Sequence, residues 1–553
     1  MKGMRQPEPA QPAHAPAEGL RQAMSWLHTW AGLVFGWLLF AMFLTGALSF
    51  FRPEITRWMR PEVAVQPVSA ARSVEVAEAY LRRHAPDAAR WFIVASTARE
   101  PGVRISYQAA KPPPGQRGFR RVTLDPVTGQ EIHARETRGG DFLYRFHFQL
   151  EMGVPWGRWL AGIAGMFMLV AILSGIITHK KLFADFFTFR PRKGGQRAWM
   201  DGHNALSVLG LPFHLMITFS GLVLLASLLM PAGILAAYDN EREFFDEAFP
   251  AFAMKPASGQ AAPLVPLAPL VAQAEQAWDG GAIQRMVVNR PGDAAATVSL
   301  SRAVSDRVSY GRQAPTLTFD GVTGQPLGGT GEAGAVGTVA GTVVGLHLGL
   351  FAQPLLRWAY FLVSLAGTAM VGTGLALWIA KRRQKLRSGA PDTLSLRLVD
   401  VLNAGSIAGL CVACAAYFWA NRVLPADLPA RGQWETRIFF AAWAASYVYA
   451  ALRGRRKWRD LSALGALLLL LLPVLNALTT DRHLGASLPA GDWVMAGFDL
   501  SALVAGLLLA WIARKSGGRE QAASRRPARH ATAGPDGAAP PLAGSSNAAY
   551  ESR

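Results

Sequence analysis

The chain has 553 residues, of which 51% are hydrophobic, and it contains several apolar runs of eighteen or more residues. Runs of this length cross a bilayer as helices, so the composition indicates a polytopic membrane protein and excludes a soluble enzyme. A net charge of +19 is compatible with nucleic-acid binding. However, the lysines and arginines concentrate in alternate loops and in the C-terminal tail, which is typical of membrane topology, so we predict a lipid bilayer and no nucleic-acid partner.

Eight segments are predicted to be transmembrane helices. They are Trp26–Phe51, Pro155–Ile177, Leu206–Met230, Leu355–Ala380, Leu398–Ala420, Ile438–Leu452, Leu461–Leu478 and Val494–Ala513. The first is too long for a signal-peptide core and lacks a convincing cleavage site, so we expect it to be retained. The positive-inside rule places the basic loops and both termini in the cytoplasm of a bacterial cell, and the protein in the inner membrane.

The predicted domains follow from these spans. In chain order they are a disordered cytoplasmic leader (1–24), the first span (25–51), a first periplasmic module (52–154), the second span (155–179), the third span (203–230), a second periplasmic module (231–354), the fourth span (355–380), a C-terminal bundle of four spans (398–513) and a disordered cytoplasmic tail (514–553). The leader and tail are rich in Pro, Ala, Gly and polar residues, a composition that does not support a packed core.

The two periplasmic segments have the same order of elements. Each contains a helical stretch, then alternating runs that are typical of strands, and each ends in a turn sequence, DPVTG at 125–129 and DGVTG at 320–324. Asp and Gly supply the turn chemistry between strands. We therefore predict two small α+β modules that form part of an internal repeat.

The spans continue this repeat. His28 and His203 each precede a Ser/Thr-Gly pair by the same distance, ending at Gly46 and Gly221. His147 and His347 each stand shortly before the proline that opens the next span, and both of those spans contain an Arg-Trp pair and a later Ser/Thr-Gly pair. Two copies of span, module and span thus have histidines at equivalent places, which packing alone does not explain.

His203 and His214 lie eleven residues apart on an apolar segment. In one straight helix this spacing is within roughly 20° of three whole turns and rises about 16 Å, so both imidazoles would point the same way. Ionisable groups inside a membrane span are costly and suggest function, and stacked histidines are what two haems at different depths need. The alternative is a solvated residue at a helix start and a hydrogen-bonded packing residue, and Pro212 can kink the register.

Six histidines are therefore candidate haem ligands. The repeat pairs His147 with His347 on the periplasmic side and His28 with His203 on the cytoplasmic side, while His179 and His214 have no counterparts and remain alternatives on the cytoplasmic side. Two haems are expected, and they are of b type because no CxxCH sequence permits covalent attachment. The two cysteines, Cys411 and Cys414, form neither a disulfide scaffold nor a zinc cluster.

The segment from Ser25 to Arg383 resembles the PepSY-associated transmembrane helix family. The resemblance is carried by the LHTWAGL opening, the DPVTG and DGVTG module ends, and the spans of the form HxxL…RW…(S/T)G. It implies PepSY-like periplasmic modules and, by analogy with members of the FoxB type, a b-haem inner-membrane reductase of ferric siderophores. Some relatives carry a cytoplasmic flavin and NADPH domain, but here we expect no GxGxxG that opens a strand-helix unit, and the cytoplasmic loops are too short to hold such a domain.

The expected function is electron transfer across the membrane to a ferric siderophore in the periplasm, with release of Fe(II). Electrons would come from a separate donor, either quinol or a cytoplasmic reductase, and no catalytic residue or particular siderophore can be named. Two alternatives stay open at this point: an electron carrier with another periplasmic acceptor, and a non-enzymatic PepSY protein that binds a peptide or peptidase.

Overall fold

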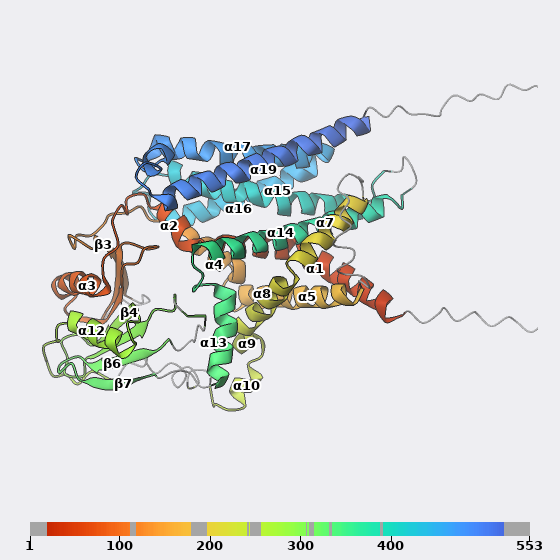
Figure 1. The fold of residues 1–553 in the computed structure, drawn as a ribbon. Helices are drawn as coiled ribbons and strands as arrows, with labels where there is room; N and C mark the ends of the chain where they lie inside the picture. The colour runs from red at the N-terminus through yellow and green to blue at the C-terminus, as the bar shows by residue number, and fades with distance from the viewer. Residues whose placement is uncertain are drawn as a thin grey trace, which may run out of the picture.

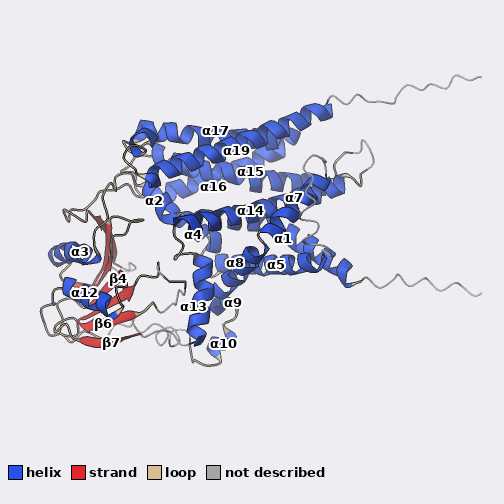
Figure 2. Ribbon diagram, in the orientation of Figure 1, coloured by secondary structure: helices blue, strands red, loops and turns tan. Residues whose placement is uncertain are grey.

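The computed structural model describes residues 19–110, 118–178, 196–240, 243, 256–305, 307–308, 314–330, 335–386 and 391–524. A bundle of long helices makes up most of it, and a β-sheet stands at one end of the bundle (Figure 1). The strands form the sheet, and the helices form the bundle, except for two helices that cover the sheet (Figure 2).

Six of the described helices are long and apolar enough to cross a membrane, and one bent pair would make a seventh. The six are α1 (Leu20–Ser49), α5 (Trp156–Thr178), α14 (Pro354–Arg383), α15 (Leu394–Val423), α17 (Lys457–Thr479) and α19 (Trp493–Ser524). The bent pair is α7 (Gln196–Leu209) and α8 (Leu211–Leu224). Apolar helices of about twenty residues match the hydrocarbon thickness of a bilayer, so this is a multi-pass membrane protein.

The sixth predicted span needs correction. Ile438–Leu452 is the second part of α16 (Arg431–Leu452), which is long enough to cross but is not among the helices of sufficient hydropathy. Its first two turns carry Arg431, Glu435 and Arg437. The eight predicted spans are therefore six or seven by length and composition.

The third predicted span is not one straight helix. The chain bends by 69° between α7 and α8, at Gly210. Pro212 stands in the first turn of α8, where its missing N–H is tolerated but would interrupt a continuous helix. Short helices α9 (Ala226–Leu229) and α10 (Ala232–Leu235) follow. The bend removes the basis for placing His203 and His214 on one helix face.

The strands of the two segments predicted as α+β modules lie in one seven-stranded antiparallel sheet. Its strand order is β3-β2-β1-β4-β5-β6-β7. The strands are β1 (Ala88–Val94), β2 (Val103–Ala109), β3 (Phe119–Leu124), β4 (Ile283–Asn289), β5 (Thr297–Arg302), β6 (Thr316–Asp320) and β7 (Pro326–Thr330). β1 of the first segment pairs with β4 of the second, with Phe92 opposite Val287, so each segment closes the open edge of the other.

Helices α3 (Ala70–His84) and α12 (Ala268–Ala277) cover one face of this sheet, on the side away from the bundle (Figure 1). Their apolar residues, such as Leu81 and Val271, share one buried core with alternate strand residues such as Trp91 and Val298. Alternation along a strand sends neighbouring side chains to opposite faces, so the remaining strand residues occupy the other face.

The two turn sequences fold alike. Asp125 Oδ1 accepts the N–H groups of Val127 (2.8 Å) and Thr128 (3.0 Å), and Asp320 Oδ1 accepts those of Val322 (2.9 Å) and Thr323 (2.8 Å). The glycine that ends each turn has a φ of 72° or 73°, which a side chain would oppose.

Four further helices complete the fold. They are α2 (Arg52–Met59), α4 (Gly139–Gln149), α13 (Ala335–Leu348) and α18 (Leu484–Ser487). Of these, α4 and α13 lie at the sheet end of the bundle (Figure 1), and each carries a histidine near its C-terminus.

Candidate functional site

Two histidines meet at the sheet end of the bundle. The ring centroids of His147 on α4 and His347 on α13 are 6.2 Å apart, with 32° between the ring planes. We call them the sheet-side pair. They come from segments 200 residues apart in sequence (347 − 147) that the repeat alignment made equivalent.

A second pair involves α1, nearer the N-terminus of that helix than its contact with His147. His28 on α1 and His203 on α7 have ring centroids 6.1 Å apart and ring planes at 67°. We call them the distal pair. His147 contacts Met42 on α1. Met42 is fourteen residues after His28 (42 − 28), so the two positions differ by a rise of about 21 Å along the helix.

All four histidines use Nδ1 in the same way. Each Nδ1 lies within hydrogen-bond distance of a backbone carbonyl: His147 to Met42 (2.7 Å), His28 to Ala171 (2.7 Å), His347 to Ile217 (2.9 Å) and His203 to Met370 (2.9 Å). A carbonyl only accepts, so Nδ1 carries the proton and the lone pair of each neutral ring is on Nε2. This is the arrangement that orients and activates an imidazole as a metal ligand.

The Ser/Thr-Gly pairs of the sequence explain how the rings fit. Each backbone carbonyl that contacts a histidine Nδ1 belongs to the residue four positions before the glycine of a Ser/Thr-Gly pair. That glycine lies against the ring of the same histidine. A Cβ would lie 2.7 Å from the His147 ring at Gly46, 2.9 Å from the His347 ring at Gly221, 3.2 Å from the His28 ring at Gly175 and 3.1 Å from the His203 ring at Gly374. The sequence showed the four pairs but not this reason for them.

The sheet-side rings are partly buried, and α4 and α13 are not among the spanning helices. Burial lowers the pKa of His147, and burial together with the nearby His147 ring lowers the pKa of His347. Both imidazoles are therefore neutral at physiological pH, the state in which histidine binds metals.

The four rings fit a haem better than a bare metal ion. Within the part of the chain that the structure describes, no three His, Cys, Asp or Glu side chains are grouped so that they could hold a metal ion. A zinc site takes three or four protein ligands, whereas haem iron needs only axial ones. An imidazole nitrogen lies about 2 Å from its metal, so rings on opposite sides of one metal have centroids roughly 6 Å apart, as in both pairs.

The two remaining candidates are placed differently. His179 lies outside the described residues. His214 is 1% exposed on α8; its Nε2 is 3.4 Å from the carbonyl of Val363, and its ring packs against Phe43 and Phe213. These contacts match the packing interpretation of His214, and the bend at Gly210 is the reason that its direction differs from the prediction.

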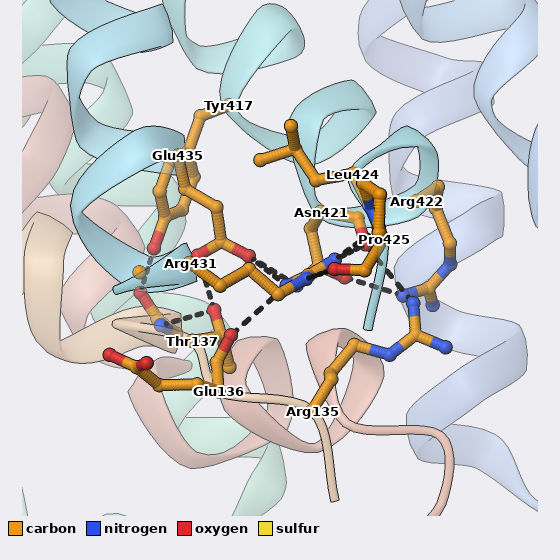
Figure 3. A network of polar contacts seen from close by, with 12 residues as sticks. Arg135, Glu136, Thr137, Tyr417, Asn421, Arg422, Leu424, Pro425, Arg431 and Glu435 are labelled. Atoms are coloured by element: carbon orange, nitrogen blue, oxygen red, sulfur yellow. Dashed lines mark hydrogen bonds and ion pairs between the residues drawn. The ribbon is translucent and has the colours of Figure 1, made fainter. Parts of the chain in front are cut away.

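A polar cluster that the sequence did not reveal positions α4 (Figure 3). Arg431 Nη1 donates to Glu435 (2.5 Å) and to the carbonyl of Glu136 (3.0 Å), and Glu435 also accepts from Thr137 (2.5 Å) and Asn421 (2.7 Å). The Tyr417 hydroxyl donates to the carbonyl of Gly139, the first residue of α4 (2.9 Å). We call this cluster the clasp.

The clasp joins the C-terminal bundle to the segment that leads into His147. Arg431 and Glu435 are both 0% exposed, and an unpaired charge at such a place would be very costly. The signal in the sequence was an Arg and a Glu four residues apart at the start of an apolar helix. An Arg and a Glu at this spacing on a helix usually form a surface ion pair. The sequence did not show that Arg431, Glu435 and Tyr417 bond residues 136–139.

A comparison with known proteins covers the histidine-bearing part of the chain. Protein PA4219 of Pseudomonas aeruginosa, which is uncharacterized, is 28% identical over 394 residues, a match that covers 67% of this chain and 94% of that protein. The model of the PepSY-associated TM region family matches residues 25–381, which include all four paired histidines and the whole sheet but not the C-terminal bundle. The family resemblance is thereby confirmed: this chain belongs to the PepSY-associated TM region family.

Proposed function

We propose that this protein is a haem-b reductase of the bacterial inner membrane that passes electrons across the bilayer to ferric siderophores in the periplasm. The observation that carries the proposal is the presence of two histidine pairs, one on α4 and α13 and the other on α1 and α7, at different levels of the bundle. Each pair has its Nδ1 atoms on backbone carbonyls and a ring spacing that suits one iron. A lone histidine such as His84 has the carbonyl contact, at 2.9 Å from Tyr80, but not the paired ring.

His147 with His347, and His28 with His203, would hold the two haems. Bound haem would supply one-electron chemistry, and ligation by two imidazoles suits electron transfer rather than oxygen binding. The chain itself would orient the imidazoles through the four carbonyls. His179 and His214 remain the alternatives for the distal site.

The sidedness of the proposal rests on charge. The loops at 180–197, 381–397 and 453–459 are basic, so both termini would be cytoplasmic and the sheet, formed by two PepSY-like modules of an internal repeat, would be periplasmic. The GxGxxG match at 329–334, GTGEAG, begins in β7, an edge strand of an antiparallel sheet, and so is not part of the parallel strand-helix unit that binds a dinucleotide. The electron donor would therefore be a separate quinol or cytoplasmic reductase.

The reaction is a one-electron reduction of the siderophore-bound iron from Fe(III) to Fe(II). Hard oxygen donors hold the lower charge less tightly, so iron leaves the siderophore without covalent chemistry on the ligand. One electron from the donor balances each iron released.

Purified protein tests this directly. Its optical spectrum should contain a Soret band and a reducible α-band, and dithionite-reduced protein in anaerobic liposomes should be oxidised within seconds by a ferric siderophore added on the sheet side. A chelator on that side should trap Fe(II), and NADPH alone should reduce nothing. Protein that lacks haem when haem is supplied, or reduced haem that ferric siderophores leave unchanged, would overturn the proposal.

A further inference from the structure

A serine on α8 contacts one ring of the sheet-side pair directly. The Oγ of Ser220 lies 3.0 Å from Nδ1 of His347, and the carbonyl oxygen of Ile217 lies 2.9 Å from the same nitrogen. Ser220 is 1% exposed, so its hydroxyl has its hydrogen-bond partners inside the protein rather than in water. The contact therefore joins the buried side of α8 to α13.

The neighbouring acceptors fix the direction of this hydrogen bond. The Ser220 hydroxyl has a single proton, and the carbonyl of Met216, only 2.6 Å away, accepts it. The carbonyl of Ile217 can only accept, so Nδ1 of His347 carries a proton of its own. This N–H group is therefore shared between two acceptors, the Ile217 carbonyl and the Ser220 oxygen, and the lone pair of the ring stays on Nε2.

The internal repeat provides a comparison for this contact. Thr45 on α1 stands where Ser220 stands in the Ser/Thr-Gly pairs, and its hydroxyl likewise donates to a carbonyl four residues earlier, that of Ala41 (2.7 Å). Within the described contacts, however, the Thr45 hydroxyl does not reach the ring of His147. The carbonyl of Met42 is the acceptor for Nδ1 of that ring.

The two rings also lie differently against their glycines. A Cβ on Gly46 would be nearest to Nδ1 of His147, at 2.7 Å. A Cβ on Gly221 would be nearest to Cε1 of His347, at 2.9 Å, and 3.5 Å from its Nδ1. The second ring is thus turned so that its Nδ1 is free of the glycine and meets the serine.

A second acceptor changes the strength of an imidazole as an iron ligand. A hydrogen bond from one ring nitrogen raises the basicity of the other, ligating nitrogen. A more basic ligand stabilises Fe(III) relative to Fe(II), and hydrogen bonding to an axial ligand is one of the ways in which a protein sets the potential of a haem. His347, with two acceptors, is therefore expected to be a stronger donor to Fe(III) than His147.

We propose that Ser220 is a positioning residue that holds His347 and lowers the reduction potential of the sheet-side haem. This inference rests on the proposed function, which it deepens by naming a residue that sets the driving force for reduction of the chelate. Hard oxygen donors favour Fe(III), so iron held by them is difficult to reduce. A low potential on the sheet side is what such a substrate requires.

The test is a redox titration of the purified full-length protein, followed through the haem α-band. Ser220→Ala removes one acceptor and leaves the Ile217 carbonyl, so we expect the sheet-side haem to be retained and its midpoint potential to rise. The ratio of reduced to oxidised haem at a fixed electrode potential should increase about two- to tenfold, the range expected for one hydrogen bond. Ser220→Thr keeps a hydroxyl and should restore a potential close to that of the wild type.

Two further variants assign and control the titration. His147→Ala should keep only the distal haem, so its single step identifies which wild-type step belongs to the sheet-side haem. Ser49→Ala is the matched control, because the Ser49 hydroxyl also donates to a carbonyl four residues earlier, that of Thr45 (2.7 Å), but contacts none of the described histidines. It should shift neither potential.

An unchanged or lower potential in Ser220→Ala would overturn the inference. The same holds if Ser220→Thr behaves like Ser220→Ala, since the hydroxyl would then have no role. Loss of the sheet-side haem in Ser220→Ala but not in Ser220→Thr would support it, because the hydroxyl would then hold the ring. The titration uses no siderophore, so a shifted potential in protein that ferric siderophores fail to oxidise would leave this inference standing and overturn the proposed reductase function.

Discussion

The histidine-bearing part of the chain and the C-terminal bundle bury polar groups in opposite ways. In residues 25–381 each of the four paired histidines has Nδ1 within hydrogen-bond distance of a backbone carbonyl, a neutral acceptor. In the C-terminal bundle, Arg431 donates to five acceptors, and its partner Glu435 accepts three hydrogen bonds. We infer that the first part is arranged to bind a ligand, whereas the buried charges of the second are satisfied within the chain, in part by residues 136 and 137 of the first.

This difference assigns the two parts separate roles. In the proposed function the histidine pairs provide the haem ligands, and the bundle packs against α4 and supports it. Phe142 and Phe146 on α4 belong to the same buried core as Tyr417 and Phe439 of the bundle. The family match ends at residue 381, so this support is a feature of the chain beyond the matched region.

The largest expected effect comes from the histidines. Replacing His147 or His347 by Ala should remove the sheet-side haem, about half of the total, because one axial ligand is lost. His28→Ala or His203→Ala should remove the other half. Haem per protein is measured by the pyridine haemochrome assay.

His84→Ala is the control for this series, since His84 stacks on Tyr80 in α3 and faces no second histidine of the described pairs. It should keep full haem content. If all four alanine variants of the paired histidines kept the haem content of the wild type, these histidines would not be haem ligands. The proposed difference between the histidine-bearing part and the C-terminal bundle would then be wrong.

The next effect concerns the clasp. Glu435→Ala leaves a buried guanidinium without its carboxylate, so we expect a loss of about 3–5 kcal/mol in stability. Replacing both residues, R431M/E435M, should recover much of that loss, because no charge is then left unpaired. Asp427→Ala, an exposed change on the neighbouring loop, should have little effect.

Thermal unfolding of the detergent-solubilised protein measures these changes, and haem content is measured in parallel. The clasp lies before α4 and contacts none of the distal pair in the described contacts. The haem of the sheet-side pair should therefore be more labile than that of the distal pair in Glu435→Ala. Equal stability of Glu435→Ala and wild type would mean that the bundle does not hold α4.

A smaller effect should come from the glycines that face the rings. A Cβ on Gly46 would lie 2.7 Å from His147 Nδ1, so Gly46→Ala should displace the ring and its hydrogen bond to Met42. Gly32→Ala on the same helix is a matched control, because a Cβ there meets nothing within 4 Å. We expect Gly46→Ala to shift the midpoint potential or the EPR signal of one haem, and Gly32→Ala to shift neither. Identical spectra in the two variants would contradict a fitted ring site.

The sequence predicted these regions unequally, for physical reasons. The pairing of histidines and the Asp turns followed from spacings along the chain, because duplicated segments place equivalent residues at equivalent positions. The joining of β1 to β4, the bend at Gly210 and the clasp could not be predicted, since each depends on contacts between segments far apart in sequence.

The smallest expected effect tests whether the two halves of the sheet are energetically alike. Asp125 and Asp320 each accept two backbone N–H groups at the same turn positions, so replacing either by Ala removes the same interactions. Each replacement should cost about 1 kcal/mol, the net value of a typical hydrogen bond, since the exposed N–H groups regain water. Thermal unfolding of Asp125→Ala and Asp320→Ala should therefore give similar decreases in Tm and leave the haem spectrum unchanged. A much larger decrease in Tm for one of the two variants would contradict this expectation. It would show that the two turns contribute unequally to the stability of the sheet, although their hydrogen bonds are the same.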